Sequence, residues 1–263
     1  MTELVRAERE GPLLSVTITR PDKRNALSGD TLAALERAFR AADGDRELAL
    51  AVLTGSGSRA FAAGGDLHEL QALRSVQDIE PFTRAARRAL DAIRRFPVPV
   101  VAVLNGDALG GGAELAVACD ARVAAAHARI GFVQGKLAVS TAWGGGIDLM
   151  RLLGSARALE LLGSGRLVGA AEALALGLVN AVAPAEEDAS AFARAWCRAW
   201  LEQAPHVMRA FKRQALAERL GRSREEREAF EHEDFVASWL HADHWRAAEA
   251  LVAGLGGQRV ASE

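Results

Sequence analysis

Two glycine clusters, each followed by a carboxylate, are the segments of the sequence best suited to chemistry. They are FAAGGDL at residues 61–67 and ALGGGAE at residues 108–114. Consecutive glycines let the backbone turn with positive φ and leave N–H groups pointing outward. Two such N–H groups aimed at one point form an oxyanion hole, which stabilises a developing enolate or tetrahedral oxygen. For either cluster alone, the alternative is a tight connection between a strand and a helix.

Glu114 lies within one turn of the second cluster, where a carboxylate can act as a base, an acid or an electrostatic partner. The alternative is a carboxylate that only favours the positive end of a helix. His68 follows the first cluster, and we expect it to be a partly exposed helix residue and not a functional group.

An α/β core is predicted to position these clusters. A hairpin is expected from strands at 4–9 and 13–19, followed by a helix over 31–42 with Ser28 or Asp30 as its cap. Buried strands are predicted at 48–53, 100–104 and 121–126, with an amphipathic helix at about 76–96. Strands that alternate with helices indicate right-handed crossovers in an α/β fold. From about residue 186 the pattern predicts helices only.

Composition excludes several classes of protein. The chain has 263 residues and a formal net charge of −2, so it lacks the basic surface that nucleic-acid binding requires. No apolar run is long enough to span a membrane, and the N-terminus has no leader pattern, so we expect a cytoplasmic protein. Cys119 and Cys197 are far apart and have no ligand spacing, which predicts buried thiols and no metal site.

Four motifs in order resemble the crotonase superfamily, also called the enoyl-CoA hydratase/isomerases. They are TITRPDKRNALS, FAAGGDL, LNGDALGGGAELAVACD and ARIGFVQGKLAVSTAWGGG, which span roughly residues 10–185. The resemblance implies a core of repeated ββα units over residues 1–185 that binds an acyl-CoA thioester. It also implies a C-terminal helical subdomain over residues 186–263 that assembles trimers or dimers of trimers. Coenzyme A would enter as part of the substrate, and no other cofactor is expected.

The resemblance also implies roles for individual residues. The N–H groups of Gly65 and Gly111 would hold the thioester oxygen, and Glu114 would be the first catalytic carboxylate. Trp143 and Gly144 would line the mouth of the acyl pocket, although Trp143 could equally be a core anchor of a helix. The residues expected beside the coenzyme A moiety are Lys23, Arg24, Ala26, Ala63, Asp66 and Leu67. Basic residues of the C-terminal helices could meet its phosphates, but a solvated helix face is the simpler interpretation for Arg209, Lys212 and Arg213.

One departure from the family pattern guides the prediction of the reaction. Hydratases carry a second catalytic glutamate, and here that position holds Gln134. An amide forms hydrogen bonds but cannot take up a proton near neutral pH, so efficient hydration is in doubt. Decarboxylation of an alkylmalonyl-CoA generates the enolate without a second acid or base, and local motifs resemble ethylmalonyl- and methylmalonyl-CoA decarboxylase-like members. Our leading hypothesis is therefore a decarboxylase. The alternatives are an enoyl-CoA hydratase or isomerase, and a non-catalytic binding protein on the same fold.

Overall fold

The computed structural model describes residues 3–260, with side chains described up to residue 252. Two sheets form its core. The larger sheet has six strands in the order β1-β2-β3-β5-β7-β10, and all of its neighbouring pairs are parallel except β1 and β2. These strands are β1 (Val5–Glu10), β2 (Leu13–Ile18), β3 (Leu50–Gly55), β5 (Val100–Leu104), β7 (Ala121–Ala124) and β10 (Ala181–Val182).

The smaller sheet has four short strands in the order β4-β6-β8-β9. They are β4 (Ala60–Ala62), β6 (Asp107–Leu109), β8 (Arg129–Gly131) and β9 (Val168–Gly169). Along the chain, a strand of the larger sheet is repeatedly followed by a strand of the smaller sheet and then by a helix, as in β5-β6-α4. This repeat confirms the predicted α/β core of ββα units.

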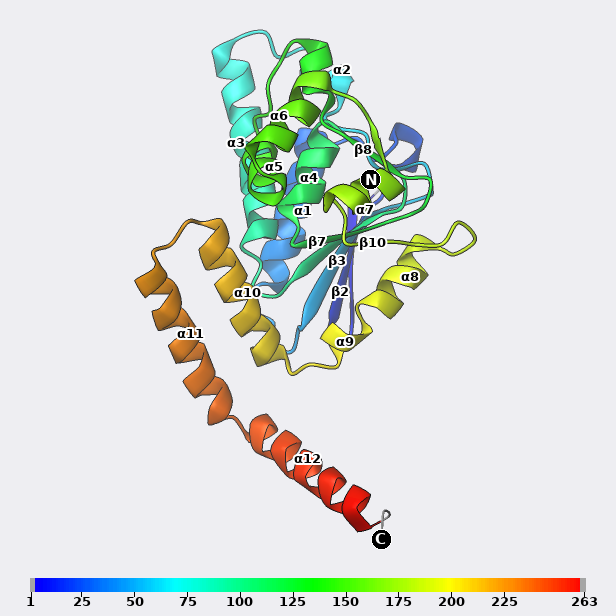
Figure 1. The fold of residues 1–263 in the computed structure, drawn as a ribbon. Helices are drawn as coiled ribbons and strands as arrows, with labels where there is room; N and C mark the ends of the chain where they lie inside the picture. Colours follow the sequence, from blue (N-terminus) through cyan, green and yellow to red (C-terminus); the bar gives the residue numbers. More distant parts are fainter. Residues whose placement is uncertain (1–2, 261–263) are drawn as a thin grey trace.

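The helices cover the sheets and then leave them. Those of the core are α1 (Gly29–Ala42), α2 (Leu67–Leu70), α3 (Val76–Arg94), α4 (Gly111–Ala118), α5 (Gly145–Leu153), α6 (Ser155–Ser164) and α7 (Ala170–Leu176), with 3₁₀ turns η1 (Pro21–Lys23) and η2 (Val133–Leu137). The later helices are α8 (Ala189–Trp196), α9 (Arg198–Leu201), α10 (Pro205–Arg219), α11 (Arg224–Trp239) and α12 (Ala242–Val260). Figure 1 shows that α10 lies beside the core, whereas α11 and α12 extend away from it.

Local sequence accounts for most of these boundaries. The side chain of Ser28 accepts a hydrogen bond from the N–H of Thr31, so Ser28 and not Asp30 caps α1. Apolar residues of β3 and β5 are buried on both faces, as strands covered by helices require. Ser75 and Asp78 form a capping box at the start of α3.

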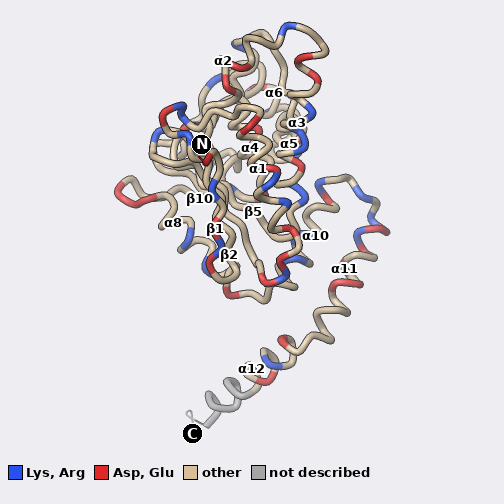
Figure 2. The backbone as a smooth tube through the Cα atoms, turned by 180° about the vertical axis from the view of Figure 1, so that it is seen from behind, with Lys and Arg blue, Asp and Glu red and all other residues tan. Residues whose placement is uncertain are grey.

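Charge is distributed evenly over the described chain. Figure 2 shows Lys and Arg interspersed with Asp and Glu along the core and the C-terminal helices. Among the described helices, none is both long and apolar enough to cross a membrane.

Candidate active site

Glu114 lies in the first turn of α4, the most buried helix of the core. Strand β6 leads directly into this helix through Gly110, whose φ of 52° is in the region that favours glycine. Every residue of α4 is buried, and Glu114 is only 2% exposed. A buried carboxylate requires hydrogen-bond donors to offset the loss of water.

Three donors hold the Glu114 carboxylate in place. Its Oε2 accepts hydrogen bonds from the backbone N–H groups of Trp143 (3.0 Å) and Gly145 (2.9 Å). Its Oε1 accepts one from the amide Nε2 of Gln134 (2.9 Å). Burial raises the pKa of Glu114 above its ordinary value of 4.5, although the three donors oppose that rise. A fixed, desolvated carboxyl of this kind is typical of groups that transfer protons in catalysis.

Gln134 lies in η2 and faces Glu114. Its Nε2 donates a hydrogen bond to Glu114, whereas its Oε1 is buried without a hydrogen-bond partner among the described residues. An orphaned buried oxygen costs free energy unless a water or ligand donates to it. The structure thus leaves one acceptor beside Glu114 for such a donor.

The two glycine clusters meet beside this pair. Gly64 has a φ of 102°, and a Cβ there would lie 3.0 Å from the carbonyl oxygen of Leu109 and 3.6 Å from the nitrogen of Gly111. Within residues 3–260, neither Gly65 N–H nor Gly111 N–H donates a hydrogen bond to the chain. Both donors remain available for a ligand oxygen, which is what an oxyanion hole requires.

The ring of Trp143 covers both glycines. A Cβ on Gly111 would lie 2.5 Å from Cη2 and 3.0 Å from Cε3 of this ring, and one on Gly65 would lie 3.8 Å from Cη2. Trp143 is buried and packs against Phe82 of α3 at 6.0 Å between ring centroids. The ring therefore forms a wall against the backbone of the two glycines.

Three consecutive glycines at residues 144–146 bring the start of α5 against Glu114. A Cβ on Gly145 would lie 2.5 Å from the Cβ and 2.6 Å from the Cα of Glu114. Only glycine lets the start of α5 approach closely enough for its N–H to reach the carboxylate. This is a physical reason for glycine at position 145 that the sequence did not reveal.

The basic loop after β2 lies against the first glycine cluster. The N–H of Ala63 donates to the carbonyl of Arg24 (3.0 Å), and that of Leu27 donates to the carbonyl of Gly64 (2.8 Å). Lys23 and Arg24 are exposed, and Ala26 is half-buried between the two loops. The two segments that the resemblance assigned to coenzyme A are thus neighbours.

Asp66, Leu67 and His68 have more local surroundings. Asp66 forms an ion pair with Arg20 (2.9 Å) through one carboxylate oxygen, and its other oxygen accepts a hydrogen bond from the N–H of His68. Arg20 also donates to the carbonyl of Ala26. Asp66 thereby ties the two loops together, and Arg20 is a residue that the sequence did not single out. Leu67 and His68 are exposed on the short helix α2.

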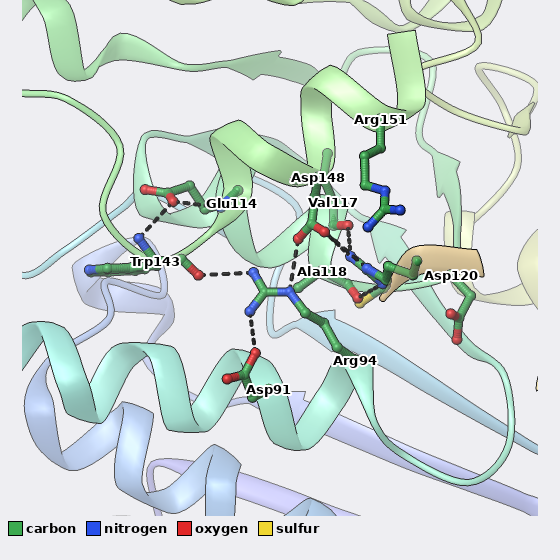
Figure 3. A network of polar contacts seen from close by, with 12 residues as sticks. Asp91, Arg94, Glu114, Val117, Ala118, Asp120, Trp143, Asp148 and Arg151 are labelled. Atoms are coloured by element: carbon green, nitrogen blue, oxygen red, sulfur yellow. Dashed lines mark hydrogen bonds and ion pairs between the residues drawn. The ribbon is translucent and has the colours of Figure 1, made fainter. Parts of the chain in front are cut away.

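An ion-pair network contacts the backbone segments next to Glu114 and its hydrogen-bond donors (Figure 3). Arg94 donates to Asp148 (2.8 Å) and to the carbonyl of Trp143 (2.9 Å). Arg219 of α10 donates to the other Asp148 oxygen (2.9 Å) and to the carbonyls of Val117 and Ala118 at the end of α4. This network connects α3, α4, α5 and α10, and no local sequence pattern predicts it because its members are far apart in the chain.

Arginines also line a cavity of about 310 Å³ beside this network. Trp143 and Gly144 contribute to its wall, but Glu114 and Gly111 do not. Its other charged lining residues are Arg87, Asp91, Arg94, Arg95, Asp148, Arg151 and Arg219. Charged side chains and apolar ones such as Ile147, Leu216 and Leu220 therefore share the lining of this cavity.

The basic residues of α10 are bound within the fold. Lys212 is buried and pairs with Asp120, so its prediction as part of a solvated face was wrong. Arg209 donates to the carbonyl of Asp45, and Arg213 pairs with acidic residues of α11. Both cysteines are buried thiols, as predicted.

Known proteins are similar to this chain in both sequence and fold. Residues 8–253 match the enoyl-CoA hydratase/isomerase family. The chain is 36% identical over 180 residues to a short-chain-enoyl-CoA hydratase of Clostridium acetobutylicum, covering 68% of this chain and 69% of that one. It is 38% identical to a crotonyl-CoA hydratase of Syntrophomonas wolfei over the same shares of each chain.

A solved enoyl-CoA hydratase of Bacillus anthracis superposes with a TM-score of 0.89 at 27% identity, covering 95% of this chain and 96% of that one. The relatives named here are hydratases, so they give no support to the decarboxylase hypothesis. The match over nearly the whole chain, together with the paired glycine turns and the buried Glu114, establishes that the chain belongs to the enoyl-CoA hydratase/isomerase family, the crotonase superfamily.

Proposed function

We propose that this protein hydrates an enoyl-CoA thioester and that Glu114 moves the proton. The observation that carries the proposal is the buried Glu114 carboxyl, which two backbone N–H groups and one amide fix beside two unused glycine N–H groups. The hydratase names of the relatives support an enoyl-CoA substrate. This choice departs from our sequence-based preference for decarboxylation.

The geometry supports a mechanism with one carboxylate. The thioester oxygen would accept hydrogen bonds from the N–H groups of Gly65 and Gly111, which stabilise the negative charge that develops on it. A water held by Glu114 and by the orphaned Oε1 of Gln134 would add its oxygen to C3. Glu114 would take the proton that this water loses and return it to C2, so that one water is added in total. The Gln134 amide orients the water but transfers no proton.

Decarboxylation of an alkylmalonyl-CoA is the second candidate, and the presence of Gln134 instead of a second carboxylate favours it. Loss of CO₂ leaves the electron pair of the broken C–C bond in the enolate. Its oxygen would be held by the same two N–H groups, and one proton would then add at C2. This route needs only a single proton donor beside the substrate.

Turnover of three thioesters separates these reactions. The purified protein is mixed with crotonyl-CoA, ethylmalonyl-CoA and methylmalonyl-CoA, and products are identified by mass spectrometry. Hydration predicts a gain of one water on crotonyl-CoA and no CO₂ from the other two. Release of CO₂ without any change in crotonyl-CoA would reject hydration in favour of the second candidate. A double-bond shift without water gain in a longer enoyl-CoA would instead identify an isomerase.

The variant Gln134→Glu tests the one-carboxylate mechanism. A second proton-transfer group at this position should raise the hydration rate, because general acid-base catalysis contributes about 10²–10⁴-fold. Hydration that appears only in the variant would show that the natural site is not built for it. If Glu114→Ala binds acyl-CoA normally and neither it nor the natural protein turns over any thioester, the chain is a binding protein.

We also propose that the protein forms a homotrimer or a dimer of trimers through its C-terminal helices. Large apolar side chains are exposed along α11 and α12, which protrude from the core (Figure 1). They are Phe235, Val236, Trp239, Leu240, Trp245, Leu251 and Val252. Exposed apolar surface on this scale marks association sites. A molar mass of one chain by light scattering at micromolar concentration would contradict this proposal.

A further inference from the structure

Two histidines and an aspartate come together where α10 meets the turn between α11 and α12. His206 lies in the first turn of α10, His241 follows the end of α11, and Asp243 lies in the first turn of α12. Helices α10 and α11 pack against each other, which returns the end of α11 to the start of α10 (Figure 1). The cluster is therefore a product of the tertiary fold and lies away from the Glu114 site.

The donor atoms of these three side chains have the separations of a metal site. All three lie within 4.8 Å of one another. Asp243 Oδ2 is 3.4 Å from His241 Nδ1 and 3.8 Å from His206 Nδ1. Ligands of a tetrahedral zinc ion, at bond lengths of about 2.1 Å, are separated by about 3.4 Å. One of the two distances already matches this value, and the other differs from it by a few tenths of an ångström.

Contacts with neighbouring groups orient the three side chains. Arg246 pairs with Asp243 through Oδ1, which leaves Oδ2 facing the two rings. The imidazole rings are held at 3.9 Å between centroids. A cation here would replace the 3.2 Å hydrogen bond from the Asp243 N–H to His241 Nδ1.

The donor set selects the class of ion. Two of the three donors are imidazole nitrogens, which suit zinc and similar first-row ions, whereas magnesium and calcium prefer all-oxygen sites. We propose that His206, His241 and Asp243 bind one zinc-like divalent cation that links α10 to the α11–α12 turn. Because the ligands come from three segments, the ion fixes the direction in which α12 leaves the core.

Calorimetric titration of the full chain with zinc chloride after chelator treatment tests this proposal. One zinc ion per chain is expected in the natural protein. His206→Ala, His241→Ala and Asp243→Asn should each weaken binding by at least about tenfold, since each removes a ligand. His232→Ala is the matched control, because His232 is an exposed histidine of the neighbouring helix α11, outside the cluster, and its replacement should leave binding unchanged.

A second readout distinguishes a built site from loose surface binding. Cobalt(II) in the natural protein should give the visible absorption bands of a tetrahedral site, and Asp243→Asn should abolish them without changing the far-ultraviolet circular dichroism. Zinc affinity weaker than about 1 mM in the natural protein would overturn the proposal. Equal affinity in His232→Ala and His241→Ala would overturn it as well. Neither readout depends on the reaction proposed for Glu114.

Discussion

Replacing Glu114 with glutamine should greatly reduce catalysis while stabilising the fold near neutral pH. The new amide has nearly the same shape as the carboxyl, and its oxygen can still accept from the N–H groups of Trp143 and Gly145. Its NH₂ group would face Gln134, whose amide can rotate to present the Oε1 that is now without a partner. The variant therefore keeps every hydrogen bond and loses only the charge and the ability to move a proton.

The kinetic effect follows from the lost proton transfer. Loss of a general acid-base group costs about 10²–10⁴-fold in rate, which is about 2.7–5.4 kcal/mol of transition-state stabilisation. The assay is the initial rate of crotonyl-CoA hydration, followed by the loss of enoyl-thioester absorbance. Glu187→Gln, at an exposed position outside the site, is the matched control and should retain full activity.

The effect on stability follows from the raised pKa of Glu114. A carboxyl whose pKa is higher in the folded state binds its proton more tightly there, so stability falls as pH rises from the ordinary pKa of 4.5 through the raised one. Glu114→Gln removes this loss. It should therefore unfold at a higher denaturant concentration than the natural protein at about pH 8, and at the same concentration at about pH 4. A variant that retains near-natural activity, or that is less stable only at the higher pH, would refute the reasoning.

Three further predictions concern the surroundings of Glu114. Gly111→Ala should lower the free energy of unfolding by about 1–3 kcal/mol, because the added Cβ would overlap the Trp143 ring. The double variant Gly111→Ala/Trp143→Leu should recover part of that loss when both are unfolded in denaturant. Arg94→Gln should lower the hydration rate and shift its pH profile, because Arg94 fixes the carbonyl of Trp143, whereas Arg84→Gln on the exposed side of α3 should change neither. The hydration rate of the natural protein should rise with pH across the raised pKa of Glu114, since only the ionised carboxylate accepts a proton from water. A hydration rate that does not change over that pH range would exclude Glu114 as the base.

Most of the core was predictable because its signals are local. The strand at Val100–Leu104 agrees with its predicted bounds, since a short apolar run after two prolines has few alternatives. The Ser28 cap and the opening hairpin were likewise visible in adjacent residues. By contrast, the smaller sheet was missed because strands of two or three residues, such as β9, carry no periodicity of their own.

The candidate site was predictable only in part, for the same reason. The glycine clusters and Glu114 stand out in the sequence, and the structure places them together. What orients Glu114 comes from residues distant in the chain, such as the N–H of Gly145 and the guanidinium of Arg94, which no local pattern reveals. The roles assigned to Lys23 and Arg24 remain predictions, because their exposed side chains can be tested only with bound coenzyme A.

The central claim is that one thioester oxygen is held by two glycine N–H groups beside Glu114. A crystal structure with a non-hydrolysable enoyl-CoA analogue tests it most directly. The account predicts the carbonyl oxygen of the analogue at about 2.7–3.1 Å from the nitrogens of both Gly65 and Gly111, with C2 facing Glu114. An analogue bound with its carbonyl away from these nitrogens, for example in the arginine-lined cavity beside Arg94, would contradict the account.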